Sequence, residues 1–234
     1  MELVLNKKPK NPIIIEGFPG FGFVGAIATQ FLIEHLDAKP IGFIYSNEIT
    51  PLVTIHKNNL MQPLSIYYDH KNNIVIVHAL TPVNGLEWKI ANVVEKLYKD
   101  LKAKELICLE GVNALTESNE SKAYFQSTVA SSQKKLEKLG LKSLGEGVIL
   151  GVTGAVLLKK LPVSCIFAEA HMNLPDSKAA AKIIQVLDSY LGLKVDYKPL
   201  LKRAEEMESK IKGMISKTRE VQDIKAKKEL DYFG

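Results

Sequence analysis

The stretch Glu16-Gly17-Phe18-Pro19-Gly20-Phe21-Gly22-Phe23-Val24-Gly25 separates a short apolar run, residues 13–15, from a segment with helical spacing, residues 25–36. The run of three isoleucines is typical of a buried strand. In the following segment Ile27, Phe31 and Leu36 recur at helical intervals. Glycine allows the chain to turn sharply between the two. The sequence therefore predicts a strand, a tight turn and a helix, which is the first unit of an α/β fold.

The same alternation continues along the chain. Further strands are expected at residues 41–45, 74–79, 105–109, 148–150 and 163–168, with a hairpin or meander formed by residues 52–55 and 64–68. Helices are expected at residues 86–101, 123–139, 151–159 and 177–191, and residues 115–122 are expected to form a loop. This order predicts one α/β domain, residues 1–196, with a mostly parallel central sheet covered by helices on both faces.

After residue 196 the pattern changes to that of a helical arm, residues 197–234. Apolar side chains recur there at alternating spacings of three and four: Leu200, Ala204, Met207, Ile211, Met214, Thr218 and Val221. So narrow an apolar stripe needs a partner surface. Two interpretations remain open, a helix folded against its own domain and a coiled coil that holds copies of the chain together.

Charge and composition limit the classes of partner. The formal charge of +5 comes from 31 Lys and Arg against 26 Asp and Glu, and ten basic against seven acidic residues place +3 of it after residue 196. The lysines alternate with acids and have no aromatic platform beside them, so no nucleic-acid partner is expected. Without a signal sequence or an apolar run of about 18 residues, we expect a cytoplasmic protein that has no membrane partner.

The glycines of the turn also match a cofactor motif. Gly20, Gly22 and Gly25 spell G-x-G-x-x-G, and Glu48 could be the acidic residue that binds a ribose. The residues between the glycines, however, include Phe21 and Phe23, which favours a structural turn. We therefore expect no cofactor.

Polar residues at the ends of expected strands were considered as a catalytic site. They are Glu16, His78, Glu110, Glu169 and His171. Such a set could perform acid–base chemistry or hold a metal ion. Glu16-Gly17 and Glu110-Gly111 fit turn capping better, and the chain lacks a Gly-x-Ser-x-Gly elbow, a P-loop and the CxxC and HxxxH spacings. The interpretation adopted is a protein without catalytic, cofactor-binding or metal-binding residues.

The stretch from Glu16 to Gly25, taken with Ser46-Asn47-Glu48 and Pro51, closely resembles the opening signature of the PAC2 family, the archaeal and bacterial relatives of proteasome assembly chaperones. The resemblance continues through Pro63, Glu110-Gly111, residues 151–154 and Pro175. It implies a fold similar to nucleoside phosphorylases without an established active site, often in homo-oligomers. It also implies a structural role for the signature loop, namely Glu16, Gly17, Phe18, Pro19, Gly20, Gly22 and Gly25.

The family resemblance also gives meaning to the C-terminus. Some members are thought to bind the proteasome α-ring through a hydrophobic-Tyr-X tail. This chain ends in Leu230, Asp231, Tyr232, Phe233 and Gly234, so phenylalanine stands at the tyrosine position. The ring can still be buried, but a hydroxyl hydrogen bond is lost. The alternative is a frayed end whose aromatic rings pack back on the arm.

The function expected from the sequence is that of an ATP-independent, non-catalytic chaperone for 20S proteasome assembly. Its expected partners are proteasome α-subunits and further copies of the chain. The alternative is a small-molecule enzyme or nucleotide-binding protein of phosphorylase-like or ATP-grasp-like type, which would use Glu16, His78, Glu110 or Glu169.

Overall fold

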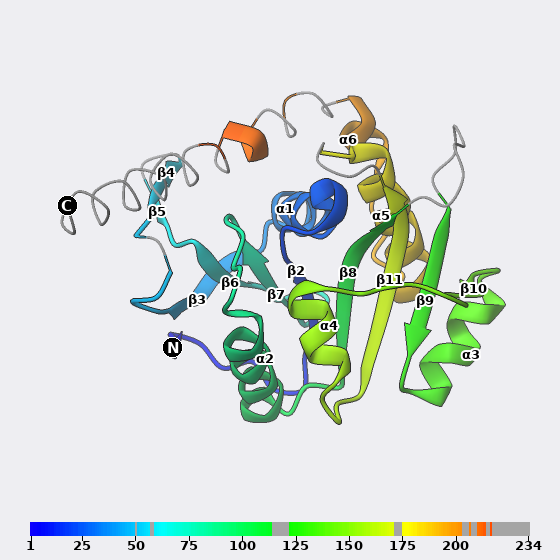
Figure 1. The fold of residues 1–234 in the computed structure, drawn as a ribbon, viewed down its shortest axis with the longest axis horizontal. Helices are drawn as coiled ribbons and strands as arrows, with labels where there is room; N and C mark the ends of the chain where they lie inside the picture. The colour runs from blue at the N-terminus through cyan, green and yellow to red at the C-terminus, as the bar shows by residue number, and fades with distance from the viewer. Residues whose placement is uncertain are drawn as a thin grey trace, which may run out of the picture.

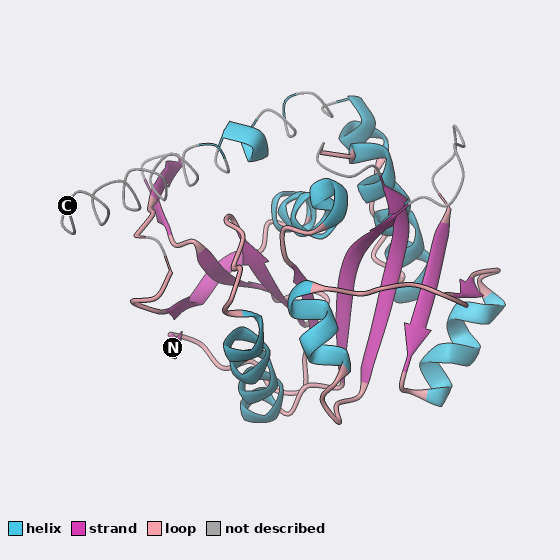
Figure 2. Cartoon of the chain, viewed as in Figure 1, coloured by secondary structure: helices cyan, strands magenta, loops and turns pink. Residues whose placement is uncertain are grey.

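A nine-stranded sheet forms the centre of the computed structural model, which describes residues 1–49, 51–56, 59–113, 122–170, 175–202, 206, 210–213 and 216 (Figures 1 and 2). The strand order is β1-β3-β6-β7-β2-β8-β11-β9-β10. These strands are β1 (Glu2–Leu5), β2 (Ile13–Gly17), β3 (Lys39–Tyr45), β6 (Leu64–Asp69), β7 (Ile74–Ala79), β8 (Glu105–Asn113), β9 (Ala123–Ser127), β10 (Lys142–Ser143) and β11 (Val163–Ala170). The expected α/β architecture is therefore confirmed.

The sheet is mixed rather than mostly parallel. Strands β7, β2, β8 and β11 are parallel neighbours, whereas β1, β3 and β6 pair antiparallel with the strands beside them. Strand β9 is antiparallel to β11 and parallel to the two-residue edge strand β10. The link from β6 to β7 is only residues 70–73, and a connection this short can join only antiparallel strands. The parallel strands thus form the centre of the sheet, where helical crossovers are available.

Helices cover both faces of this centre (Figure 1). They are the 3₁₀ turn η1 (Phe21–Phe23) and α1 (Val24–His35), α2 (Glu87–Leu101), α3 (Ala130–Lys138), α4 (Gly151–Leu157), α5 (Ser177–Leu191) and α6 (Lys198–Lys202). Helices α1, α5 and α6 pack over one apolar cluster, while α2 and α4 pack over the other. Every residue of β7 and β11 is buried, as expected for strands covered on both faces. No helix in the described part of the chain is both long and apolar enough to span a membrane.

The helix expected at residues 123–139 begins later than predicted. Its first part is strand β9, which pairs antiparallel with β11 and buries Phe125 with 1 % of its surface exposed. Helix α3 starts only at Ala130 and is followed by Gly140, which has a positive φ of 83°. Aromatic residues suit a strand with one buried face, and this tertiary pairing overrides the helical spacing of the segment.

The hairpin predicted from residues 52–55 and 64–68 is wrong in its pairing. A separate two-stranded sheet joins β4 (Thr54–His56) to β5 (Asn59–Met61), and β6 instead lies between β3 and β7. Most of the loop expected at residues 115–122 lies outside the described residues.

The strand expected at residues 148–150 has no partner strand among the described residues. Residues 145–150, which we call the strap, cross in front of β9, β11 and β8 on the way to α4 (Figure 1). Val148 is 77 % exposed and Leu150 is 63 % exposed, while Ile149 between them is half-buried. The side chains therefore alternate as in a strand, but no ladder forms.

Two described residues of the C-terminal segment are buried against the body. Leu200 of α6 is completely buried, and Ile211 is 8 % exposed, both in the cluster beneath α1 and α5. The other positions of the predicted coiled-coil stripe, namely Ala204, Met207, Met214, Thr218 and Val221, lie outside the described residues. The coiled coil and the domain boundary at residue 196 stay predictions.

Helix α1 packs closely on the sheet because of a glycine. A Cβ atom at Gly25 would overlap the carbonyl oxygen of Leu109 in β8, so a side chain at this position would push the helix away from the strand. The signature glycine is thus explained by backbone contact.

We predict that Gly25→Ala destabilises the fold by about 1–3 kcal/mol, the usual cost of overpacking. The better helix propensity of alanine offsets at most about 1 kcal/mol of this loss. Gly145→Ala is the matched control, because a Cβ atom there would meet nothing within 4 Å. Urea unfolding of the two variants measures the difference, and equal midpoints would contradict the close contact.

Candidate functional site

Two carboxyl groups meet at the carboxyl ends of the central strands. Glu16 of β2 pairs in register with Cys108 of β8, and Glu110 follows two residues later on the same face of the sheet. Glu16 is 0 % exposed and Glu110 is 6 % exposed. The structure thus brings together two of the five residues considered for catalysis.

A threonine from α4 links these two carboxyl groups. The Thr153 hydroxyl oxygen lies 3.2 Å from Oε1 of Glu16 and 3.2 Å from Oε2 of Glu110. A hydroxyl group has one proton to donate, so it can satisfy only one ionised carboxylate. If the other carboxyl is protonated, it donates to the threonine oxygen instead. When one of the two carboxyl groups is protonated, Thr153 can therefore hydrogen-bond to both of them.

Burial raises both carboxyl pKa values. Desolvation raises the pKa of Glu16 to about 7, against the opposing effect of hydrogen bonds from Cys108 and Thr153. Desolvation, and then the charge of Glu16, raise the pKa of Glu110 to about 8, against hydrogen bonds from Thr153 and the backbone of Gly111 and Phe21. The pair can therefore exchange a proton near neutral pH.

The signature loop closes over Glu110. Oε1 of Glu110 accepts a hydrogen bond from its neighbour Gly111 N at 3.1 Å, and the backbone of Phe21 provides another. A Cβ atom at Gly20 would overlap this carboxylate. An internal carboxylate thus uses N–H donors at the glycine turn where a dinucleotide motif would hold phosphate. Glu48, the candidate ribose ligand, is instead exposed and pairs with Lys89 of α2.

Two buried thiols continue the polar cluster into the core. Cys108 and Cys165 are opposite each other in the parallel pair β8–β11, and both are fully buried and unbonded to one another by a disulfide. The thiol of Cys108 also hydrogen-bonds to Glu16. Burial is the largest of the effects that raise the Cys108 pKa well above its usual value, so this thiol stays protonated.

His78 occupies the opposite face of the sheet, beneath α1. Its Nδ1 lies 2.8 Å from the hydroxyl oxygen of Thr29, and that hydroxyl donates to the carbonyl of Gly25 at 2.9 Å. From this bonding pattern we assign the imidazole proton to Nδ1, which then donates to the Thr29 oxygen. Nε2 is buried without a partner among the described residues, and desolvation lowers the His78 pKa to about 4.

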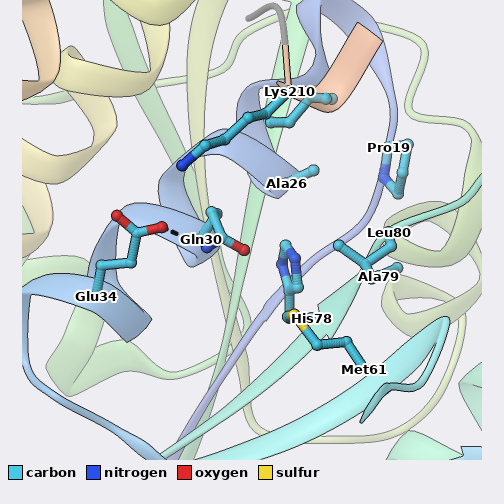
Figure 3. A pocket seen from close by; sticks show the side chains of 10 residues that line it. Pro19, Ala26, Gln30, Glu34, Met61, His78, Ala79, Leu80 and Lys210 are labelled. Carbon is cyan, nitrogen blue, oxygen red and sulfur yellow. Dashed lines mark hydrogen bonds between the residues drawn. The ribbon is translucent and has the colours of Figure 1, made fainter. Parts of the chain in front are cut away.

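A small cavity of about 40 Å³ lies beside His78 (Figure 3). Figure 3 shows the imidazole between Met61 of β5 and Ala26 of α1, and Ile211 of the C-terminal segment also lines the space. The cavity has room for a water molecule but not for a substrate. His78 is thus a buried structural residue, and it lines the same small cavity as Ile211 of the C-terminal segment.

A larger groove opens above Glu110, with a volume of about 720 Å³. It is lined by the strap and the start of α4, by the signature loop, and by residues 82–84 and 87. Glu110 is the one member of the buried pair that lines it. This size is within the range of ligand sites.

The remaining candidate residues are distributed as follows. Glu169 accepts a hydrogen bond of 2.8 Å from Tyr124 and takes no part in the Thr153 bridge. His171 and the tail residues Leu230, Tyr232, Phe233 and Gly234 lie outside the described residues. Within the part that the structure describes, no three His, Cys, Asp or Glu side chains are placed to hold a metal ion.

Sequence reasoning missed Thr153 and the strap groove. Thr153 is 137 residues from Glu16 in sequence, and only the fold reveals that they touch. The sequence did indicate part of the strap, because residues 148–150 were predicted to form a strand.

Comparison with known proteins now adds to this geometry. The model of the PAC2 family matches residues 14–215. Pyrococcus furiosus PbaA, described as an archaeal homolog of proteasome-assembly chaperone, is 34% identical with a TM-score of 0.85, covering 94% of this chain and 99% of PbaA. Pyrococcus furiosus PbaB, described as an archaeal proteasome activator, is 25% identical with a TM-score of 0.74, covering 91% and 97%. The Methanocaldococcus jannaschii protein MJ0106 is 29% identical over 88% of this chain and 86% of its own length.

The buried pair predicts a distinctive pH dependence of stability. Both carboxyls have folded-state pKa values above 4.5, so the folded protein keeps protons that the unfolded chain has released. Their contribution is therefore complete below pH 4.5 and is lost as the pH rises through 7 to 8. Glu110→Gln keeps the shape without the charge and should raise the free energy of unfolding at pH 9, relative to wild type, by on the order of 2 kcal/mol.

Denaturant titrations of both proteins between pH 5 and pH 9 measure this effect. Glu146→Gln, on the exposed strap, is the control and should follow the wild-type curve. If the free energy of unfolding depended on pH equally in wild type and Glu110→Gln, the pair would not take up protons on folding.

The imidazole of His78 should remain neutral well below its usual titration range. Its folded-state pKa of about 4 lies below 6.5, so its contribution to stability is present above pH 6.5 and is lost as the pH falls toward 4. We expect its ring proton resonances to stay constant between pH 7.5 and 5.5 in an NMR titration, with His78→Gln used for assignment. A midpoint near 6.5 would contradict the buried, unpartnered Nε2.

Proposed function

The chain belongs to the PAC2 family, and from this membership we propose that it is an ATP-independent chaperone for assembly of the 20S proteasome. The observation that carries the proposal is the match to PbaA, which extends over nearly the whole of both chains at 34% identity. The likeness to PbaB supports the same class of partner, since PbaB is described as a proteasome activator.

The proposed partners are proteasome α-subunits, alone or in the α-ring, and further copies of this chain. The protein would act in the cytoplasm as a homo-oligomer, because several tails on one particle raise the effective concentration of a weak contact. Its role would be to hold and orient subunits, without catalysis. The burial of Glu16 and the enclosure of His78 support this view, because neither group lines a space large enough for a substrate.

We propose that part of the binding energy comes from the tail, with Leu230, Tyr232, Phe233 and Gly234 as the contacting residues. The free carboxylate of Gly234 would pair with a lysine between α-subunits, and the two aromatic rings would be buried. Phe233 has no hydroxyl group, so this tail would form one hydrogen bond fewer than a tail with tyrosine there.

The tail can be tested by removing its last three residues. We expect deletion of residues 232–234 to leave folding and oligomeric state unchanged and to weaken binding to purified α-rings by at least about tenfold, or 1.4 kcal/mol. Phe233→Tyr should instead strengthen binding by about fivefold, the equivalent of one hydrogen bond. Asp231→Asn is the matched control.

Surface plasmon resonance on immobilised α-rings measures these affinities, with size-exclusion chromatography as the check on oligomeric state. Undiminished binding of the truncated chain would refute the role of the tail. Absence of binding by the full-length chain, at concentrations up to its solubility limit, would refute the proposed partner.

A further inference from the structure

The strap has the form of a strand without its partner. Its side chains alternate, with Val148 and Leu150 exposed and Ile149 packed inward on the α2–α4 cluster. Leu150 is extended, with φ −108° and ψ −178°. Val148 and Ile149 are β-branched, which favours such a conformation, and no neighbouring strand is present among the described residues.

The strap backbone is open for hydrogen bonding. Among the described residues, none of the six N–H groups from Gly145 to Leu150 has an acceptor. On either side of the strap, the N–H group of Leu144 donates to the carbonyl of Phe125, and that of Gly154 donates to the carbonyl of Leu150. A strand edge of this kind is a template for pairing with another chain. At about 3.3 Å per residue the open edge is roughly 20 Å long, enough for a strand of about five residues.

The groove beside the strap fits an extended peptide. Val148, Ile149 and Leu150 line it in succession, and Phe18, Phe21, Pro82 and Val83 are also among its lining residues. This apolar lining would cover the alternating side chains of an added strand, while the open backbone would supply its hydrogen bonds.

The charges of the groove indicate the chemistry of its occupant. Glu110 lies at its floor and Glu87 on its wall, and Lys212, from the C-terminal segment, is the one basic side chain among the described lining residues. An incoming ammonium or guanidinium group could replace the proton shared by Glu110 and Glu16, releasing that proton to solvent. A basic residue is therefore favoured at the centre of the bound segment.

We propose that the groove along the strap binds an extended, apolar segment of a partner protein, which pairs with the strap as an additional strand and directs a lysine or arginine to Glu110. This inference rests on the proposed function for the identity of the partner, a proteasome α-subunit, but not for the existence of the site. The site is formed by the body together with Lys212 and Ser216 of the C-terminal segment.

The first experiment measures amide hydrogen exchange of the full-length chain with and without purified proteasome α-subunits. We expect the peptide that contains the strap to exchange at least about tenfold more slowly in the complex. Gly147→Pro and Val148→Pro each remove one strap N–H group, and neighbouring N–H groups point to opposite sides. One of these two variants should therefore weaken binding about tenfold, whereas Val148→Thr should not.

The second experiment uses a defined probe, acetyl-TVKVT-amide, on the chain alone. We expect this peptide to slow exchange in the strap and to bind about tenfold more tightly than acetyl-TVEVT-amide, because the lysine gains a charged hydrogen bond. N-methylation of alternate backbone nitrogens in the lysine peptide should abolish the effect, which separates strand pairing from simple apolar contact.

The two experiments separate failure of the site from failure of the proposed function. If α-subunits do not bind at all, the proposed function fails and the peptide alone decides the inference. If α-subunits bind but neither they nor the peptide slow exchange in the strap, the inference is overturned. Protection of the strap that appears in the chain alone, and only at high concentration, would show that a second copy is the occupant and would overturn the proposed partner.

Discussion

The burial of the Glu110 carboxyl group organises the structure around it. Four parts of the chain converge on this group: β8 carries it, the backbone of Phe21 in the signature loop donates to it, Thr153 of α4 bonds to it, and Thr153 joins it to Glu16 of β2. A buried carboxyl without such partners would be strongly unfavourable. Gly20 permits the loop to approach closely, because a Cβ atom at this position would overlap the Glu110 carboxylate. The covering of a buried acidic group thus explains part of the signature loop.

Local sequence patterns predicted the centre of the fold well and its margins poorly. The strands from Ile13, Ile74, Glu105 and Val163 each contain an apolar run because they are covered on both faces, and this leaves a clear signal. Strand β9 has one buried face, and its pairing with β11 is decided by residues some 40 positions away. The mixed direction of the sheet likewise depends on pairings that no local pattern encodes.

The candidate site was predictable in its acidic residues but not in its bonding. Glu16 and Glu110 were expected at strand ends, and Glu110 does accept a hydrogen bond from the backbone of Phe21 in the turn η1. Glu16 does not, because it faces inward toward Cys108 and Thr153. This inward orientation of Glu16 involves Thr153 of α4, which lies 137 residues later in the chain. The tail residues depend on a partner surface, so their role rests on family membership.

The two buried cysteines can report on opening of the core. Cys108 and Cys165 are neighbours across the central strands β8 and β11, and both are inaccessible to solvent. A thiol reagent can reach them only when the sheet itself opens or when the α2–α4 layer moves away from it, because both thiols lie in the cluster that this layer covers. Their rate of modification therefore measures opening of this half of the core.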